Sequence, residues 1–176
     1  MGNTLNKVYK TTISPKSYNN KYGVPLSLFN INQNDDYGVI EVGMDKKGEI
    51  DQLSKIIQPD ISVITNINYA HAKNFKNVRQ IALAKAEIID NTKDNGYVVL
   101  NADDTFFSLH KKIAHKKKIK VLSFGITNQC ADIKLHNIIK SKKKYKICIK
   151  INTIKKNQKT RHKKTSPIPP YNTQSR

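Results

Sequence analysis

Apolar residues along the chain change their spacing in a repeating order that predicts alternating strands and helices. Short apolar runs at 37–42, 61–65, 97–100 and 121–124 predict strands. Apolar positions three and four residues apart predict helices at 48–57, 78–91 and 106–114. Strands that alternate with helices indicate an α/β fold, in which a parallel sheet with right-handed crossovers is flanked by helices.

The first of these strands carries few polar side chains, which predicts burial on both of its faces in a parallel sheet. Before it, the sequence predicts the end of a helix within 4–9, an extended approach to Pro15, a turn at 22–25 and a short helix at 26–29. The N-terminal part of the chain therefore belongs to the same α/β unit.

The pattern changes after Gly125. Residues 131–138 and 145–151 alternate apolar with polar side chains, and a lysine-rich segment at 141–144 joins them. This alternation predicts a C-terminal antiparallel hairpin that faces solvent. Residues 156–176 have no apolar periodicity, so we expect a domain over 1–155 followed by a disordered basic tail.

The length of 176 residues allows one domain of ordinary size. No apolar run approaches the roughly 20 residues that a membrane-spanning helix needs. The N-terminus lacks the basic and apolar regions of a secretory signal. We therefore expect a cytoplasmic protein with no membrane partner.

The net charge of +19 is concentrated near the C-terminus. Residues 1–105 hold 12 basic and 12 acidic side chains, whereas residues 106–176 hold 20 basic side chains and a single acid, Asp132. One hypothesis is a nucleic-acid-binding protein that uses residues 106–176. We favour solvated lysines instead, because the lysine runs lack the interleaved aromatic residues and glycines of RNA-binding modules.

Polar side chains follow the predicted strands at points where chemistry is often found. Glu41 ends the first strand and His71 follows the second, so we expect both at the carboxyl ends of neighbouring parallel strands, where metal–phosphate sites are built. Lys85 lies at the boundary of the apolar face of its helix, and Asn101 and Asp104 follow the third strand. Each has an ordinary alternative: a strand-terminal acid, a structural imidazole, a surface lysine or a helix cap.

Six collinear blocks of the chain resemble the central, ATP-binding domain of the Mur ligases. They are SPKSYNNKYGVPL at 14–26, VIEVGM at 39–44 with GEI at 48–50, PDISVITNI at 59–67, AH at 70–71, AKAEI at 84–88 and VLNADD at 99–104. The resemblance covers residues 10–155 and implies the family's phosphate-loop NTPase-like fold. Within the family, the asparagine pair before GVP is most similar to the branch that adds D-alanyl-D-alanine to UDP-N-acetylmuramoyl-tripeptide.

The resemblance implies roles for individual positions. Glu41 and His71 match magnesium ligands, and Lys85 matches a lysine that is carbamylated and then serves as a further metal ligand. Asn101 and Asp104 lie in the segment that contacts the adenosine of ATP. The family activates a substrate carboxylate with ATP and Mg²⁺ as an acyl phosphate, which the amine of the next peptide unit attacks. Two asparagines, Asn19 and Asn20, lie near the UDP-muramoyl substrate.

The chain also departs from the family pattern. The Gly-x-x-Gly-Lys-Thr phosphate loop, which should precede the first helix, is absent, and so are the flanking domains. Since that loop cradles the phosphates, we expect weak ATP binding and a truncated ligase that is inactive alone. A separately encoded fragment carrying the loop is a possible partner, whereas nucleic acid is not the partner that we favour.

Overall fold

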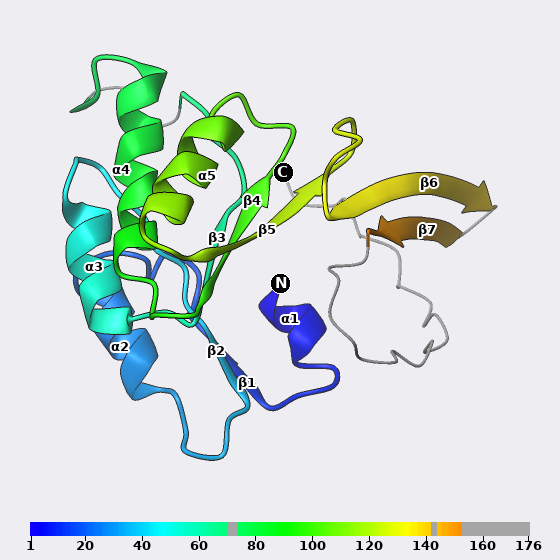
Figure 1. The fold of residues 1–176 in the computed structure, drawn as a ribbon. Helices are drawn as coiled ribbons and strands as arrows, with labels where there is room; N and C mark the ends of the chain where they lie inside the picture. The colour runs from blue at the N-terminus through cyan, green and yellow to red at the C-terminus, as the bar shows by residue number, and fades with distance from the viewer. Residues whose placement is uncertain (70–73, 142–143, 153–176) are drawn as a thin grey trace, which may run out of the picture.

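The computed structural model describes residues 1–69, 74–141 and 144–152 (Figure 1). Its helices are α1 (Gly2–Leu5), α2 (Gly23–Phe29), α3 (Glu49–Ile57), α4 (Val78–Asp90) and α5 (Phe107–Lys116). Its strands are β1 (Thr11–Ile13), β2 (Tyr37–Val39), β3 (Ile61–Ile64), β4 (Tyr97–Asn101), β5 (Lys120–Gly125), β6 (Ile133–Ser141) and β7 (Lys144–Ile151). The alternation predicted from the sequence is confirmed. His71 and the predicted tail at 156–176 lie outside the described residues.

The strands form two sheets rather than one. β1 pairs with β2 in parallel, and a second sheet has the order β3-β4-β5-β6-β7. In that sheet β3, β4, β5 and β6 pair in parallel, while β6 and β7 are antiparallel. The expectation that β2 and β3 are neighbouring strands of one sheet is therefore wrong for the described residues. An apolar run predicts that a strand exists, but it does not specify the strand's hydrogen-bonded partner.

Helices α2, α3, α4 and α5 lie together on one side of the strands, and the short helix α1 lies on the other side (Figure 1). The core between α4, α5 and the larger sheet contains Ile64, Ile89, Val98, Leu100 and Ala114, all at most 6% exposed. Alternate residues of β3 and β4 point into this core, and the residues between them are half-buried or exposed.

Burial of the first strand on both faces was also predicted, and this prediction is wrong. Tyr37 is 42% exposed, and only Val39 of β2 is partly buried. The parallel strands here are covered by helices mainly on one face, so an apolar strand does not become buried on both.

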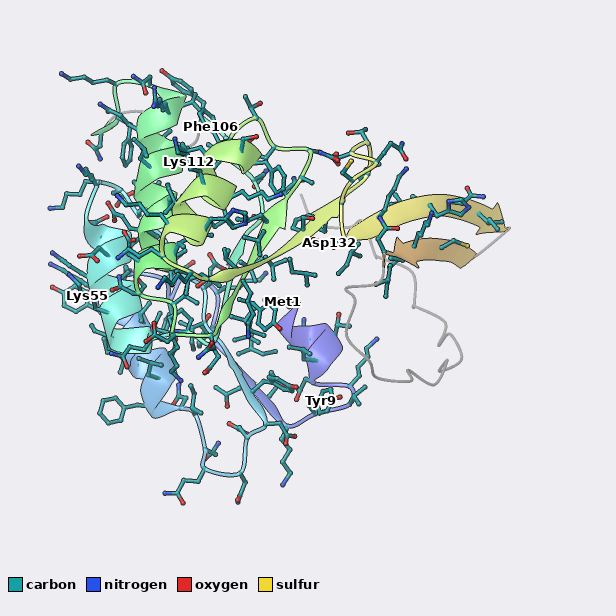
Figure 2. The ribbon with its side chains drawn as sticks, viewed as in Figure 1. Met1, Tyr9, Lys55, Phe106, Lys112 and Asp132 are labelled. Atoms are coloured by element: carbon teal, nitrogen blue, oxygen red, sulfur yellow. The ribbon has the colours of Figure 1, made fainter. Side chains whose placement is uncertain are left out.

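The C-terminal hairpin extends the larger sheet. β6 joins β5 through the pairs Phe124↔Ile133 and Gly125↔Lys134 and then continues with β7 away from the helices (Figure 1). Asp132 holds the start of the hairpin (Figure 2): its Oδ2 accepts hydrogen bonds from Ser123 N at 2.8 Å and Ser123 Oγ at 2.6 Å. The predicted solvent-facing antiparallel hairpin is confirmed.

Helix α3 begins at a cap that comes from a distant part of the chain. Gly48, with φ of +90°, precedes the helix in a left-handed conformation that favours glycine. The carboxylate of Glu87 on α4 accepts hydrogen bonds from Gly48 N at 3.0 and 3.1 Å and from Asp51 N at 3.1 Å. These donors would otherwise lack partners in the first turn, so Glu87 fastens α3 to α4. None of the helices in the described ranges is long and apolar enough to span a bilayer.

Candidate functional site

Glu41 lies in the loop after β2 and is held by both its side chain and its backbone. Its Oε1 accepts a hydrogen bond from Asn19 Nδ2 at 2.9 Å, and its N–H donates to Ser14 Oγ at 3.0 Å. Asn19 O accepts from Gly43 N at 2.7 Å, so the two loops are joined twice. A Cβ at Gly43 would lie 2.9 Å from Asn19 Cγ, which explains the glycine at this close approach. The second carboxylate oxygen of Glu41 has no partner in the described part of the chain and faces solvent.

Lys85 lies on α4 at the edge of its buried stripe. Its side chain is half-buried, and its Nζ donates to Asn66 O at 3.3 Å, in the loop that follows β3. The predicted position at the boundary of the apolar face is confirmed. The lysine therefore links the helix to the carboxyl end of a strand, where side chains are well placed to meet a ligand.

A second apolar cluster brings the loops after β2 and β3 to α4. Val42 and Ile67 pack against a core that contains Met44, Ile81 and Ala84. Val42, Ile67 and Ala84 of this cluster are the chain neighbours of Glu41, Asn66 and Lys85. The three polar residues therefore lie in the same small region of the fold. Within the described ranges no hydrogen bond or ion pair joins Glu41 to Lys85. His71, the third predicted ligand, lies outside those ranges.

The donor set fits Mg²⁺ only in part. A hard cation takes oxygen ligands, and the unpartnered oxygen of Glu41 is of that kind. The ammonium of Lys85 is a donor and a cation, so it would fit only after carbamylation replaced its charge with a carboxylate-like group. Among the described residues no group of three His, Cys, Asp or Glu side chains could hold a metal. A magnesium site here therefore needs the modified lysine, His71 or both.

Asn101 and Asp104, the residues predicted to contact adenosine, accept hydrogen bonds from backbone N–H groups in the structure. Asp104 Oδ2 accepts from Ile67 N at 2.7 Å, and its Oδ1 accepts from Phe106 N at 2.8 Å. Asn101 Oδ1 accepts from Asp103 N at 2.9 Å, while its Nδ2 has no partner among the described residues. Asp104 thus ties the loop after β3 to the start of α5, and the amide nitrogen of Asn101 is left without a partner among the described residues.

The two asparagines predicted to lie near the nucleotide-sugar substrate have different roles in the fold. Asn19 contacts Glu41, as described above. Asn20 Oδ1 accepts from Tyr22 N and Gly23 N, both at 3.0 Å, at the beginning of α2. Asn20 therefore orders the turn before that helix, which is a common role for asparagine.

Asp103, which sequence reasoning did not single out, organises the loop after β5. Its carboxylate accepts from the N–H groups of Ile126, Thr127 and Asn128 and from Thr127 Oγ1. Partial desolvation acts to raise the pKa of Asp103, but the backbone hydrogen bond from Ile126 and the other hydrogen bonds outweigh it and lower the pKa to about 2. The sequence signal was the acidic pair after a strand, but nothing in the chain showed which loop it would bind.

His110 was also missed. It is 2% exposed on α5, and its Nε2 lies 3.0 Å from Ala82 O on α4. Burial lowers the pKa of this imidazole, and the charge of Lys85 lowers it further, while the contact with Ala82 O and the charge of Asp104 raise it. His110 is a neutral structural histidine next to the residues at the rim of the sheet.

Comparisons with known proteins identify a family and a fold that the chain resembles. The family model described as the Mur ligase middle domain matches residues 1–170. A UDP-N-acetylmuramoyl-tripeptide–D-alanyl-D-alanine ligase from Buchnera aphidicola (subspecies Acyrthosiphon pisum) is 38% identical over 141 residues, which are 77% of this chain and 29% of that protein. The Bacillus subtilis ligase of the same name is 37% identical over 100 residues, which are 57% of this chain and 22% of that protein.

Solved structures give the same picture. A crystal structure of MurF from Acinetobacter baumannii superposes with a TM-score of 0.75 at 29% identity, covering 84% of this chain and 32% of that chain. MurF from Thermotoga maritima in complex with ADP gives 0.72 at 27% identity, covering 85% and 34%. The chain therefore spans about a third or less of the length of these relatives.

Proposed function

Because the chain belongs to the Mur ligase family, as its middle domain, we propose that it carries the metal- and ATP-binding part of an amide-bond-forming ligase. The proposed reaction is the addition of D-alanyl-D-alanine to UDP-N-acetylmuramoyl-tripeptide, a step of peptidoglycan synthesis in the cytoplasm. Relatives named for that reaction support the substrates, and a MurF structure with bound ADP supports the nucleotide. The contacts of Glu41 and Lys85 described above support their assignment to this reaction.

One observation carries the proposal: the loops after β2 and β3 and helix α4 share an apolar cluster through Val42, Ile67 and Ala84. Glu41 and Lys85 are the chain neighbours of two of these residues. We assign Glu41, His71 and a carbamylated Lys85 to magnesium. Bound Mg²⁺ would offset charge on the transferring phosphoryl group of ATP.

The chain's own residues have positioning roles in this proposal. Asn19 orients the Glu41 carboxylate through one oxygen and leaves the other for the metal. The contact of Lys85 with Asn66 O holds the amine at the end of β3. We assign the free amide donor of Asn101 to the adenosine part of ATP, and Asp104 shapes the same segment. Asn19 and Asn20 are assigned to the nucleotide-sugar side.

Paramagnetic Mn²⁺ tests the metal assignment, because it replaces Mg²⁺ and broadens the NMR signals of nearby nuclei. We expect broadening at the amides of residues 41–43, 66–67 and 84–86 and none at β6 or β7. The Glu41→Gln variant should bind Mn²⁺ about tenfold more weakly, since a charged ligand becomes neutral. Broadening confined to other acidic surfaces, equal in both proteins, would reject the site.

Isotopically labelled carbon dioxide tests the modified lysine. A carbamate signal should appear in the wild type and disappear in Lys85→Arg, because a guanidinium remains charged and does not form the adduct. Lys93→Arg is the matched control, since Lys93 is paired with Asp60 at 3.0 Å on the surface. A signal that persists in Lys85→Arg would refute the assignment.

We also propose that residues 1–176 alone do not turn over substrate, because no Gly-x-x-Gly-Lys-Thr loop is present to hold the phosphates. Isothermal titration with ATP and Mg²⁺ should give binding weaker than micromolar, and phosphate release with both substrates should remain at background. Micromolar binding would show that the described rim suffices for the nucleotide.

A further inference from the structure

The peptide bond that joins Asn66 to Ile67 is held from both sides. Its N–H, which belongs to Ile67, donates to Asp104 Oδ2 at 2.7 Å. Its carbonyl, which belongs to Asn66, accepts from Lys85 Nζ at 3.3 Å. A carboxylate that precedes α5 and an amine on α4 therefore bind the two ends of the same peptide group, in the loop that follows β3.

The geometry of a peptide group makes these two contacts depend on each other. The bond is planar and trans, since no cis peptide occurs in the described part of the chain, so its N–H and C=O lie in one plane and point in opposite directions. A rotation that takes the Ile67 N–H away from Asp104 also turns the Asn66 carbonyl away from Lys85. The charged acceptor at the N–H also polarises the peptide group, which strengthens the bond that its carbonyl accepts.

The start of α5 accounts for only half of the contacts of Asp104. Its Oδ1 accepts from Phe106 N at 2.8 Å, two residues ahead, as aspartate commonly does in turns and at helix starts. Its Oδ2 binds the N–H of a residue 37 positions away in the chain. That second contact lies outside the helix, so Asp104 has a further role in the loop after β3.

Apolar packing fixes the position of this loop but not the direction of its peptide group. The side chain of Ile67 packs against both apolar clusters, the one that contains Leu100 and the one that contains Met44. Such packing is non-directional, so it anchors the residue and leaves the direction of its N–H open. The carboxylate of Asp104 supplies that direction.

A third contact closes a ring of elements around Lys85. His110 on α5 has its Nε2 3.0 Å from Ala82 O on α4, one turn before Lys85. Helix α4 is thus joined to α5 by His110, α5 is joined to the loop after β3 by Asp104, and that loop is joined to α4 by Lys85. In a closed ring of this kind, each link is aligned by the other two.

We propose that Asp104 is a positioning residue for Lys85, because through the Asn66–Ile67 peptide group it aims the carbonyl that holds the Lys85 side chain. This inference rests on the proposed function for the modification of the lysine, whereas the contacts themselves stand independently of it. The segment assigned to adenosine and the lysine assigned to the metal are thereby linked by one carboxylate.

The contact with Asn66 O also orients the modified lysine. In carbamylation the neutral amine attacks the carbon of carbon dioxide: an N–C bond forms, one C–O π pair moves onto oxygen, and the nitrogen loses a proton to water. The carbamate nitrogen of Lys85 keeps a single N–H. When this N–H donates to Asn66 O, the new carboxylate points away from that carbonyl, towards the solvent side of the rim.

Amide exchange and amine labelling measure the two ends of the link in residues 1–176. NMR hydrogen exchange reports the Ile67 N–H. Acetylation by a limiting amount of acetic anhydride, followed by mass spectrometry, reports the Lys85 amine relative to Lys93 in the same sample. In Asp104→Ala both rates should rise at least about threefold, because each group loses the partner that protects it.

Asp103→Asn is the matched control. Asp103 is the neighbouring carboxylate, and it accepts hydrogen bonds from the N–H groups of residues 126–128 instead of Ile67. This variant should leave the exchange of Ile67 and the acetylation of Lys85 at their wild-type values.

Asp104→Asn keeps the test decisive if the alanine variant does not fold. Asparagine has nearly the same shape but no charge, and its single acceptor oxygen must serve both Ile67 N and Phe106 N. Both rates should therefore rise together, by less than in Asp104→Ala. Wild-type rates in folded Asp104→Asn, a rise at Ile67 without one at Lys85, or an equal rise in Asp103→Asn would each overturn the proposal.

Isotopically labelled carbon dioxide separates this proposal from the proposed function. The carbamate signal of Lys85 should fall at least about threefold in Asp104→Asn and persist in Asp103→Asn. An equal signal in the wild type and Asp104→Asn would overturn the positioning role and leave the modified lysine in place. If the wild type gives no carbamate signal, the role of Lys85 in the proposed function is rejected, and the exchange and acetylation rates still decide the role of Asp104.

Discussion

Removing the carboxylate of Glu87 should destabilise the whole domain through the start of α3. Glu87 accepts hydrogen bonds from Gly48 N and Asp51 N, and both donors would lose their partner in Glu87→Ala. Hydrogen bonds to a charged group contribute about 1.5–3 kcal/mol, and the better helix propensity of alanine offsets a few tenths. We expect a loss of about 2 kcal/mol in the free energy of unfolding. Glu87→Gln keeps one oxygen acceptor and should lose about half as much.

Thermal and urea unfolding followed by circular dichroism measure this loss. For a chain of this size, 2 kcal/mol corresponds to a fall of about 4–8 °C in the melting temperature. Asp90→Ala is the control on the same helix, because among the described residues the side chain of Asp90 makes one exposed ion pair, with Lys117 at 3.3 Å. The variant should change stability by less than about 0.5 kcal/mol. Equal shifts in Glu87→Ala and Asp90→Ala would refute the capping role.

Three further results are expected. The pKa of Asp103 is about 2 in the folded chain and near 3.8 in the unfolded chain, so the stabilising effect of its carboxylate is present above pH 4 and is lost as the pH falls towards 2. The difference in melting temperature between the wild type and Asp103→Asn should therefore shrink as the pH falls from 4 to 2. Burial lowers the pKa of His110 in the folded chain, so as the pH falls this imidazole takes up a proton in the unfolded chain before it does so in the folded chain. The stability of the wild type should therefore fall below pH 6.5, and that of His110→Gln should fall less. Asn20→Ala should cost about 1 kcal/mol in urea unfolding and leave Mn²⁺ broadening unchanged, whereas Asn19→Ala should weaken it.

The helices and the strands of the larger sheet could be predicted because their apolar spacing is regular. The stripe at 48–57 became α3, and the buried run at 97–100 became β4. The structure also placed Lys85 at the edge of the buried face of α4, as the spacing predicted. Local patterns carry this information because each helix and strand buries a face with its own period.

Pairing between strands could not be predicted in the same way. The run at 37–42 and the run at 61–65 have the same apolar character, yet they entered different sheets. The hydrogen-bond partners of polar side chains could not be predicted from the sequence either. Asp103 binds a loop more than 20 residues away, and Glu87 caps a helix that precedes it by about 40 residues. Asp104, which lies in a segment that resembles a ligand-binding motif, also accepts hydrogen bonds from backbone N–H groups, and its contact with adenosine stays a prediction.

The assignment of a magnesium site was predicted in part from local sequence patterns and in part from the resemblance to the family. The sequence placed Glu41 and Lys85 after a strand and on a helix, and the resemblance to the family gave them a common ligand. Their neighbourhoods meet in one cluster of the structure. The magnesium site of Glu41, Lys85 and His71 stays a prediction, and His71 falls outside the described residues.

The hairpin of β6 and β7 has a consequence for handling the protein. Ile138, Ile147, Ile149 and Ile151 are 44–69% exposed, and β7 is the outermost strand in the described part of its sheet. An exposed apolar edge strand of this kind favours association between copies of the chain. Lys134 and Lys150, which face each other across the two strands, give the hairpin a charge that keeps copies apart. Salt weakens that repulsion, since its range shrinks to about 3 Å at molar ionic strength, so this chain should precipitate more readily in concentrated salt than in dilute buffer.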